Sequence, residues 1–147
     1  MKRNLALLVI LMMGSTRAWA ALGNNQASVD ADAQALGGQH TVVAKTGYSL
    51  HQISMSDGSV VNEFVSPAGV VFGVSWQGRR LPDFHQLFGA YMTNFQQGQR
   101  TQVIPRRGIT IQGTDFYFTN FGRTMSFHGR AYAPSLVPTH LTAEVVQ

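Results

Sequence analysis

His51 and Glu63 are the two residues whose types and spacing could carry acid–base chemistry. Ser56-Asp57-Gly58, which lies between them, is typical of a hairpin loop. If this triplet forms the loop, residues whose numbers sum to 114 face each other, and His51 pairs with Glu63. A carboxylate beside an imidazole raises its pKa and orients it for proton transfer. On a solvent-exposed face the same pair would be an ordinary polar contact contributing less than ~1 kcal/mol, and we favour that interpretation.

Two arginine pairs are the candidate binding residues. Arg79-Arg80 follows Gly78, and Arg106-Arg107 follows Pro105. Arginine binds carboxylate and phosphate groups through two parallel hydrogen bonds, so these loops could contact an anionic ligand. Two neighbouring cations do not make a charged patch, however, and solvated turn residues are the more common outcome.

The remaining polar residues do not form a metal or nucleophile motif. The histidines lack the short spacing of zinc ligands and the chain has no cysteine, so we expect no metal site and no cofactor. Gly73-Val74-Ser75-Trp76-Gln77 begins like the nucleophile elbow of hydrolases but lacks its second glycine. The histidines are His40, His51, His85, His128 and His140.

The first twenty residues predict that the protein is exported. Lys2 and Arg3 precede an apolar run over 5–13, and Ala18-Trp19-Ala20 supplies the small residues of a cleavage site. The run is shorter than the ~20 residues that span a membrane. We therefore expect a signal peptide over 1–20, cleaved between Ala20 and Ala21. The mature chain would be periplasmic or secreted and would have no transmembrane segment.

Loss of the leader changes the charge balance. The whole sequence has eleven Lys and Arg against seven Asp and Glu. Three of those cations lie in the leader, so the mature chain has eight against seven, a net charge near +1. A nucleic-acid partner, which requires a concentrated basic surface, is not expected. Because there is no cysteine, disulfides cannot stabilise the exported fold.

The length and the pattern of elements over 21–147 predict a single α+β domain. A short helix is expected at Ser28–Leu36, with Ser28 as its cap and Gly37-Gly38 as its end. A second helix is expected over Pro82–Gln97, ended by Gly98, because apolar residues recur there at spacings of three and four. We expect an antiparallel sheet to pack one face against this helix. The expected strands are 41–44, 48–55, 59–65, 70–76, 101–104, 109–112, 116–121, 124–132 and 141–146.

Several segments also resemble a known family. They are Ala21-Leu22-Gly23, Tyr48-x-Leu50-His51-x-Ile53, the run 63–72 beginning Glu63-Phe64-Val65-Ser66-Pro67, and Trp76-x-Gly78 before Leu81-Pro82-Asp83. Together they resemble the bacterial exported family catalogued as domain of unknown function 2844. The resemblance implies a small exported bacterial protein and supplies no catalytic residues.

Two functions remain open from the sequence. The leading one is a non-enzymatic periplasmic or secreted accessory protein that binds another envelope protein or an anionic cell-envelope polymer. Its contacts would be Arg79, Arg80, Arg106 and Arg107. The alternative is a small envelope hydrolase that uses His51 and Glu63.

Overall fold

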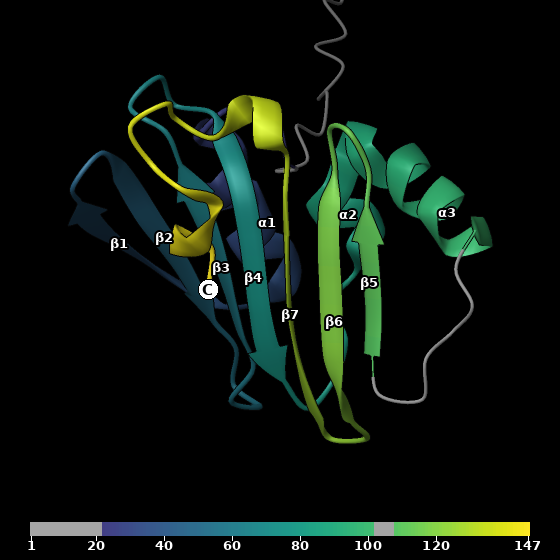
Figure 1. The fold of residues 1–147 in the computed structure, drawn as a ribbon. Helices are drawn as coiled ribbons and strands as arrows, with labels where there is room; N and C mark the ends of the chain where they lie inside the picture. The colour runs from purple at the N-terminus through teal and green to yellow at the C-terminus, as the bar shows by residue number, and fades with distance from the viewer. Residues whose placement is uncertain (1–21, 102–107) are drawn as a thin grey trace, which may run out of the picture.

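The protein is described here by a computed structural model that covers residues 22–101 and 108–147. Within them, seven antiparallel strands form one sheet in the order β1-β2-β3-β4-β7-β6-β5 (Figure 1). Each half of the sheet is a meander of consecutive hairpins. The two halves join where β4 pairs with β7, so the centre of the sheet brings together residues 49 to 59 positions apart. This architecture confirms the α+β prediction.

The first meander follows the predicted turns. Its strands are β1 (Gln39–Lys45), β2 (Tyr48–Ser54), β3 (Val60–Val65) and β4 (Val71–Gly78). Asp57 stabilises the β2–β3 turn, since its Oδ1 accepts a hydrogen bond from the Ser59 amide at 2.9 Å. His51 lies opposite Glu63, as the loop assignment predicts.

The second meander differs from the prediction at its turn, which the expected strands 116–121 and 124–132 placed at Gly122-Arg123. Its strands are β5 (Gly108–Gln112), β6 (Tyr117–Arg123) and β7 (Ser126–Tyr132). Arg123 pairs with Ser126, so the turn consists of Thr124 and Met125 rather than Gly122 and Arg123. Met125 adopts the positive φ of 71° that this tight connection requires.

Two strands predicted before and after this half of the sheet differ from the structure. The strand expected over 101–104 is wrong at its first residue, because Thr101 ends a helix; 102–107 lie outside the described residues. The strand expected over 141–146 is also wrong. The tail instead crosses the sheet and makes a short 3₁₀ turn at Ala143–Val145. Val146 is fully buried against Phe64 and Phe72, so this segment packs on the sheet face instead of joining its edge.

Helix α1 (Ala27–Leu36) matches the predicted short helix at its end but not at its start. Gly37 takes the left-handed conformation that closes it, with φ 65°. Ser28 is not the cap, because the helix begins one residue earlier. The Ser28 hydroxyl donates instead to the Asn25 carbonyl at 2.5 Å.

The long helical segment is bent. It comprises α2 (Phe84–Phe88), a 3₁₀ turn (Gly89–Tyr91) and α3 (Met92–Thr101). Asp83 begins it by accepting hydrogen bonds from the amides of His85 and Gln86. The bend falls at Gly89, whose φ of 46° is available mainly to glycine.

Gly98 does not end the helical segment as predicted. It allows α3 to approach β5, because a Cβ at this position would collide with Cγ2 of Ile111. The apolar residues predicted to form the inward stripe all pack on the core: Leu87, Phe88 and Phe95 are buried, and Phe84, Tyr91 and Met92 are partly buried.

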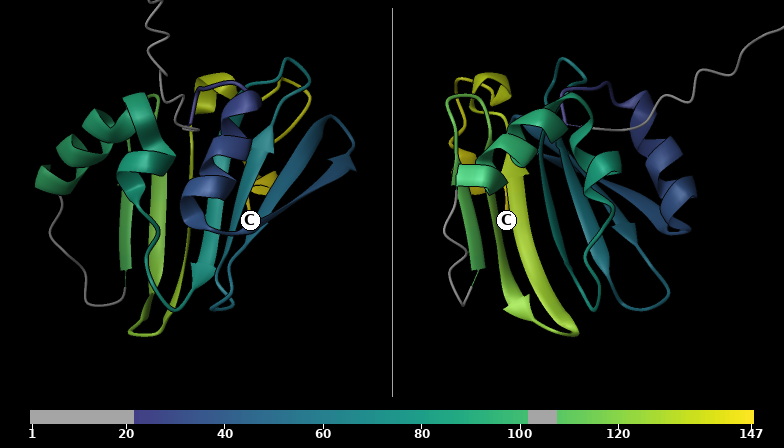
Figure 2. Two further views of the ribbon diagram at one scale, coloured as in Figure 1. Left: turned by 180° about the vertical axis from the view of Figure 1, so that it is seen from behind. Right: turned by 90° about the vertical axis from the view of Figure 1, so that its right-hand side faces the viewer.

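The α-helices of the described residues lie on one face of the sheet, behind it in Figure 1 and in front of it in the left view of Figure 2. The main core fills this interface and includes Trp76, Phe88 and Phe118. The C-terminal segment covers only part of the other face, where it forms a second apolar cluster around Phe64 and Phe72. None of the described helices is long and apolar enough to cross a membrane.

Candidate functional site

His51 and Glu63 lie in register but under the helical layer. Each is only 1% exposed. The expectation that they form a solvent-exposed pair is therefore wrong. Alternation places both side chains on the same face as the core residues Ile53 and Val61, and α1 packs over this face. Alternation in the sequence identified their common face, but only the position of α1 determines that this face is buried.

Glu63 interacts chiefly with Asp32 of α1. Burial, the negative charge of Asp32 and a hydrogen bond between the two carboxyl groups raise the pKa of Glu63 to about 9. If both groups were ionised, neither Glu63 oxygen would have a hydrogen-bond partner among the described residues. A proton held by Glu63 and donated to Asp32 removes this difficulty. Asp32 also accepts a hydrogen bond of 2.7 Å from the side-chain amide of Gln86, and this bond links α1 to α2.

His51 belongs to a separate hydrogen-bonded chain. Its Nδ1 lies 3.0 Å from Nε2 of His40, and Nδ1 of His40 lies 2.8 Å from a carboxylate oxygen of Asp30. Its Nε2 lies 3.2 Å from the hydroxyl of Ser49. Burial, followed by the neighbouring His40, lowers the pKa of His51, whereas Asp30 acts in the opposite direction. The arrangement resembles a base held beside a hydroxyl.

Neither Ser49, His51 nor Glu63 lines any of three pockets formed by described residues. Residues 22–101 and 108–147 contain no group of three His, Asp or Glu side chains that could hold a metal ion. These polar residues join α1 to the sheet, through Asp30 beside His40 and Asp32 beside Glu63.

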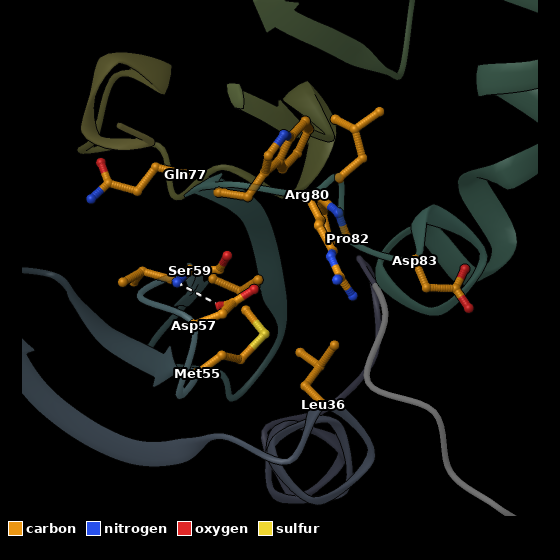
Figure 3. Close-up of a pocket in the computed structure, with 12 residues that line it drawn as sticks. Leu36, Met55, Asp57, Ser59, Gln77, Arg80, Pro82 and Asp83 are labelled. Atoms are coloured by element: carbon orange, nitrogen blue, oxygen red, sulfur yellow. Dashed lines mark hydrogen bonds between the residues drawn. The ribbon is translucent and has the colours of Figure 1, made fainter. Parts of the chain in front are cut away.

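Of the predicted arginines, Arg79 and Arg80 are described, and they do not share a pocket. Arg80 extends into a pocket of about 230 Å³, beside Leu36 of α1 and Met55 (Figure 3). Arg79 does not line this pocket; its amide donates to the Ser59 hydroxyl at 3.3 Å. Arg106 and Arg107 lie outside the described residues, as do Ala20 and Ala21 of the predicted cleavage site.

The uncovered face of the sheet carries a polar row that crosses all seven strands. Each strand contributes one side chain, and each member is the register partner of the next. Hydrogen bonds link Gln52 to Asn62 at 3.1 Å and Asn62 to Ser75 at 3.2 Å. In sheet order, the row is Thr41, Gln52, Asn62, Ser75, Arg130, Thr119 and Thr110.

The central part of this row is the floor of a groove of about 550 Å³. Its volume lies in the range of small-molecule sites. Arg130 is held in place on one side, because its Nη1 donates to the Val146 carbonyl at 2.9 Å and its guanidinium lies 5.8 Å from the Tyr117 ring centre. Phe121 is 41% exposed and lies beside the His128 ring. Of the described residues that line the groove, none has a carboxylate side chain.

Sequence reasoning missed this groove, although part of the signal was present. Thr119 and Phe121 alternate along one strand, as do His128 and Arg130 along the next. The misplaced β6–β7 turn prevented their pairing. The neighbouring residue Ser75 comes from β4, and nothing local in the sequence places β4 beside β7.

The fold and groove define a small α+β protein whose sheet is covered by helices on one face and partly open on the other. The chain belongs to the family described as "Protein of unknown function (DUF2844)", whose model matches residues 18–146. This match confirms the family resemblance noted in the sequence. No curated protein and no solved structure matches the chain.

Proposed function

We propose that the protein is an exported, non-enzymatic binding protein whose groove on the open sheet face holds an anionic polymer of the cell envelope. The leader over 1–20 would direct export and be removed after Ala20, leaving the mature protein in the periplasm or the medium. The basic start, apolar run and small residues of that segment support export.

One observation carries the binding proposal: the groove combines a fixed arginine, an exposed aromatic ring and hydrogen-bonding side chains, without an acidic side chain among its described lining residues. Such a surface attracts a negatively charged ligand and can orient it. The burial of His51 and Glu63 favours binding over hydrolysis, since a substrate must reach catalytic groups.

The binding proposal is tested by retention of envelope material on the immobilised protein. The columns carry the wild type, Phe121→Ala/His128→Ala in the groove, and Val42→Ala/His85→Ala, at two exposed positions that do not line the groove, as a matched control. Polysaccharide and protein in the eluates are measured separately. We expect polysaccharide to be retained by the wild type and the control but not by the groove variant. Equal retention by all three, or groove-dependent retention of protein alone, would contradict the proposal.

The alternative hydrolase has one specific observation in its favour, which is the contact between Ser49 and His51. A hydrolase built on this chain would use Ser49 as nucleophile rather than Glu63. We expect a fluorophosphonate probe, which labels activated serines, to leave the protein unmodified. Labelling that disappears in Ser49→Ala and in His51→Gln would establish the hydrolase instead.

A further inference from the structure

We infer that the ligand of the groove is a carboxylated saccharide, with its carboxylate bound by Arg130 and a sugar ring stacked on Phe121. This inference rests on the proposed function and specifies its ligand. Each part of such a ligand has a counterpart in the groove: a planar anion, a ring face of C–H groups and several hydroxyls.

Arg130 is prepared for a planar anion. Among the described residues, its guanidinium donates one hydrogen bond, from Nη1 to the Val146 carbonyl. The edge formed by Nε and Nη2 remains for a ligand, and this edge matches the two oxygens of a carboxylate. The Tyr117 ring lies beside the guanidinium and limits its rotation.

Phe121 supplies the surface for a sugar ring. Its ring is 41% exposed, although it belongs to a strand in the interior of the sheet. It lies opposite His128, and their ring centres are 5.9 Å apart with a tilt of 31°. The electron-rich face of an aromatic ring attracts the C–H groups on one side of a sugar.

The spacing of these two features fits one sugar unit. Arg130 pairs with Thr119, and Phe121 is two residues further along the same strand. Such diagonal neighbours in an antiparallel sheet lie about 7–8 Å apart, so a ring on Phe121 can direct its carboxylate toward Arg130.

The groove also offers hydrogen-bonding groups for hydroxyls. Gln77, Thr110 and Thr119 line it, and their side chains make no hydrogen bond to other described residues. A phosphate polymer is less well matched, because only one arginine lies among the described lining residues, whose other side chains carry hydroxyls, amides, aromatic rings and one imidazole, and because the main-chain oxygen of Gln147 also lies there, accepting a hydrogen bond from Ser75 at 2.6 Å.

The test is isothermal titration calorimetry of protein purified from cells that express the full chain. The probes are trigalacturonate, the neutral trisaccharide maltotriose, and glucose 6-phosphate. We expect trigalacturonate to bind at least tenfold more tightly than either of the others. Arg130→Ala should weaken it at least tenfold, and Phe121→Ala several-fold. Arg130→Lys should not restore full affinity, because an ammonium group lacks the paired donors.

Circular dichroism and thermal unfolding establish that each variant is folded. Arg130 also contacts Val146, so Arg130→Ala could destabilise the fold. In that case Arg130→Lys takes its place in the comparison of affinities, and Phe121→Ala provides an independent measurement. Equal affinity for trigalacturonate and maltotriose, tighter binding of glucose 6-phosphate, or no trigalacturonate binding would overturn the inference. If envelope polysaccharide were still retained in a groove-dependent manner, the binding function would stand and only the ligand class would be wrong.

Discussion

Raising the pH from about 6.5 to about 8.5 should lower the free energy of unfolding by roughly 2–3 kcal/mol, and Glu63→Gln should abolish most of this loss. The pKa of Glu63 is about 9 in the folded protein, against an ordinary value of 4.5. Between these values the folded state retains a proton that the unfolded chain releases. The stabilisation is therefore complete below about pH 4.5 and is lost as the pH rises toward 9.

The pH range is chosen to separate Glu63 from His51. Because the pKa of His51 is lowered, its contribution to stability is lost only as the pH falls below its ordinary value of 6.5. Above pH 6.5 the pH dependence of the free energy of unfolding comes chiefly from Glu63, which faces Asp32 of α1. Gln at position 63 can still donate a hydrogen bond to Asp32 and does not ionise.

Urea unfolding followed by tryptophan fluorescence at each pH measures this effect. Glu144→Gln is the matched control, since Glu144 is an exposed acid whose replacement should leave the pH dependence unchanged. If wild type and Glu63→Gln lost the same stability between the two pH values, the claim that a proton on Glu63 stabilises the buried carboxyl pair would be wrong.

Phe88→Ala should reduce the free energy of unfolding by about 3–5 kcal/mol. Phe88 is fully buried where α2 packs on the sheet, and its ring lies within 5.0–6.2 Å of five other aromatic rings. Removal of the ring leaves a cavity that rigid aromatic neighbours fill poorly. Since domains of this size are stable by about 5–15 kcal/mol, this loss is a large part of the total.

Phe121→Ala is the matched control, because the same atoms are removed from a ring that is 41% exposed. Its unfolding free energy should change by less than ~1 kcal/mol. Where Phe88→Ala does not fold, Phe88→Leu, which leaves a smaller cavity, should still be destabilised by about 1–2 kcal/mol. Urea denaturation measures all three variants. A similar loss from positions 88 and 121 would show that Phe88 is not packed in the core.

Local sequence patterns predicted much of the first half of the fold. The Ser56-Asp57-Gly58 loop fixed the register of β2 and β3, because a short hairpin loop allows few pairings. The predicted Pro82 helix located the core-facing residues Leu87, Phe88 and Phe95 through their periodicity. The same reasoning placed the end of this helix at Gly98, because glycine at a helix end and glycine at a close helix–strand contact look alike in a sequence.

The sequence alone therefore determined the family, the α+β class and the opposition of His51 to Glu63, which depend on local motifs and short-range pairing. Only the tertiary structure decided which face of the sheet is buried. A helix thirty residues before Glu63 places Asp32 against it, and pairing of β4 with β7 aligns Ser75 with Arg130. Alternation in a strand distinguishes its two faces but does not identify the face that other segments will cover. For that physical reason, His51 and Glu63 were expected in water but are buried, whereas the polar row on the uncovered face was not recognised in the sequence.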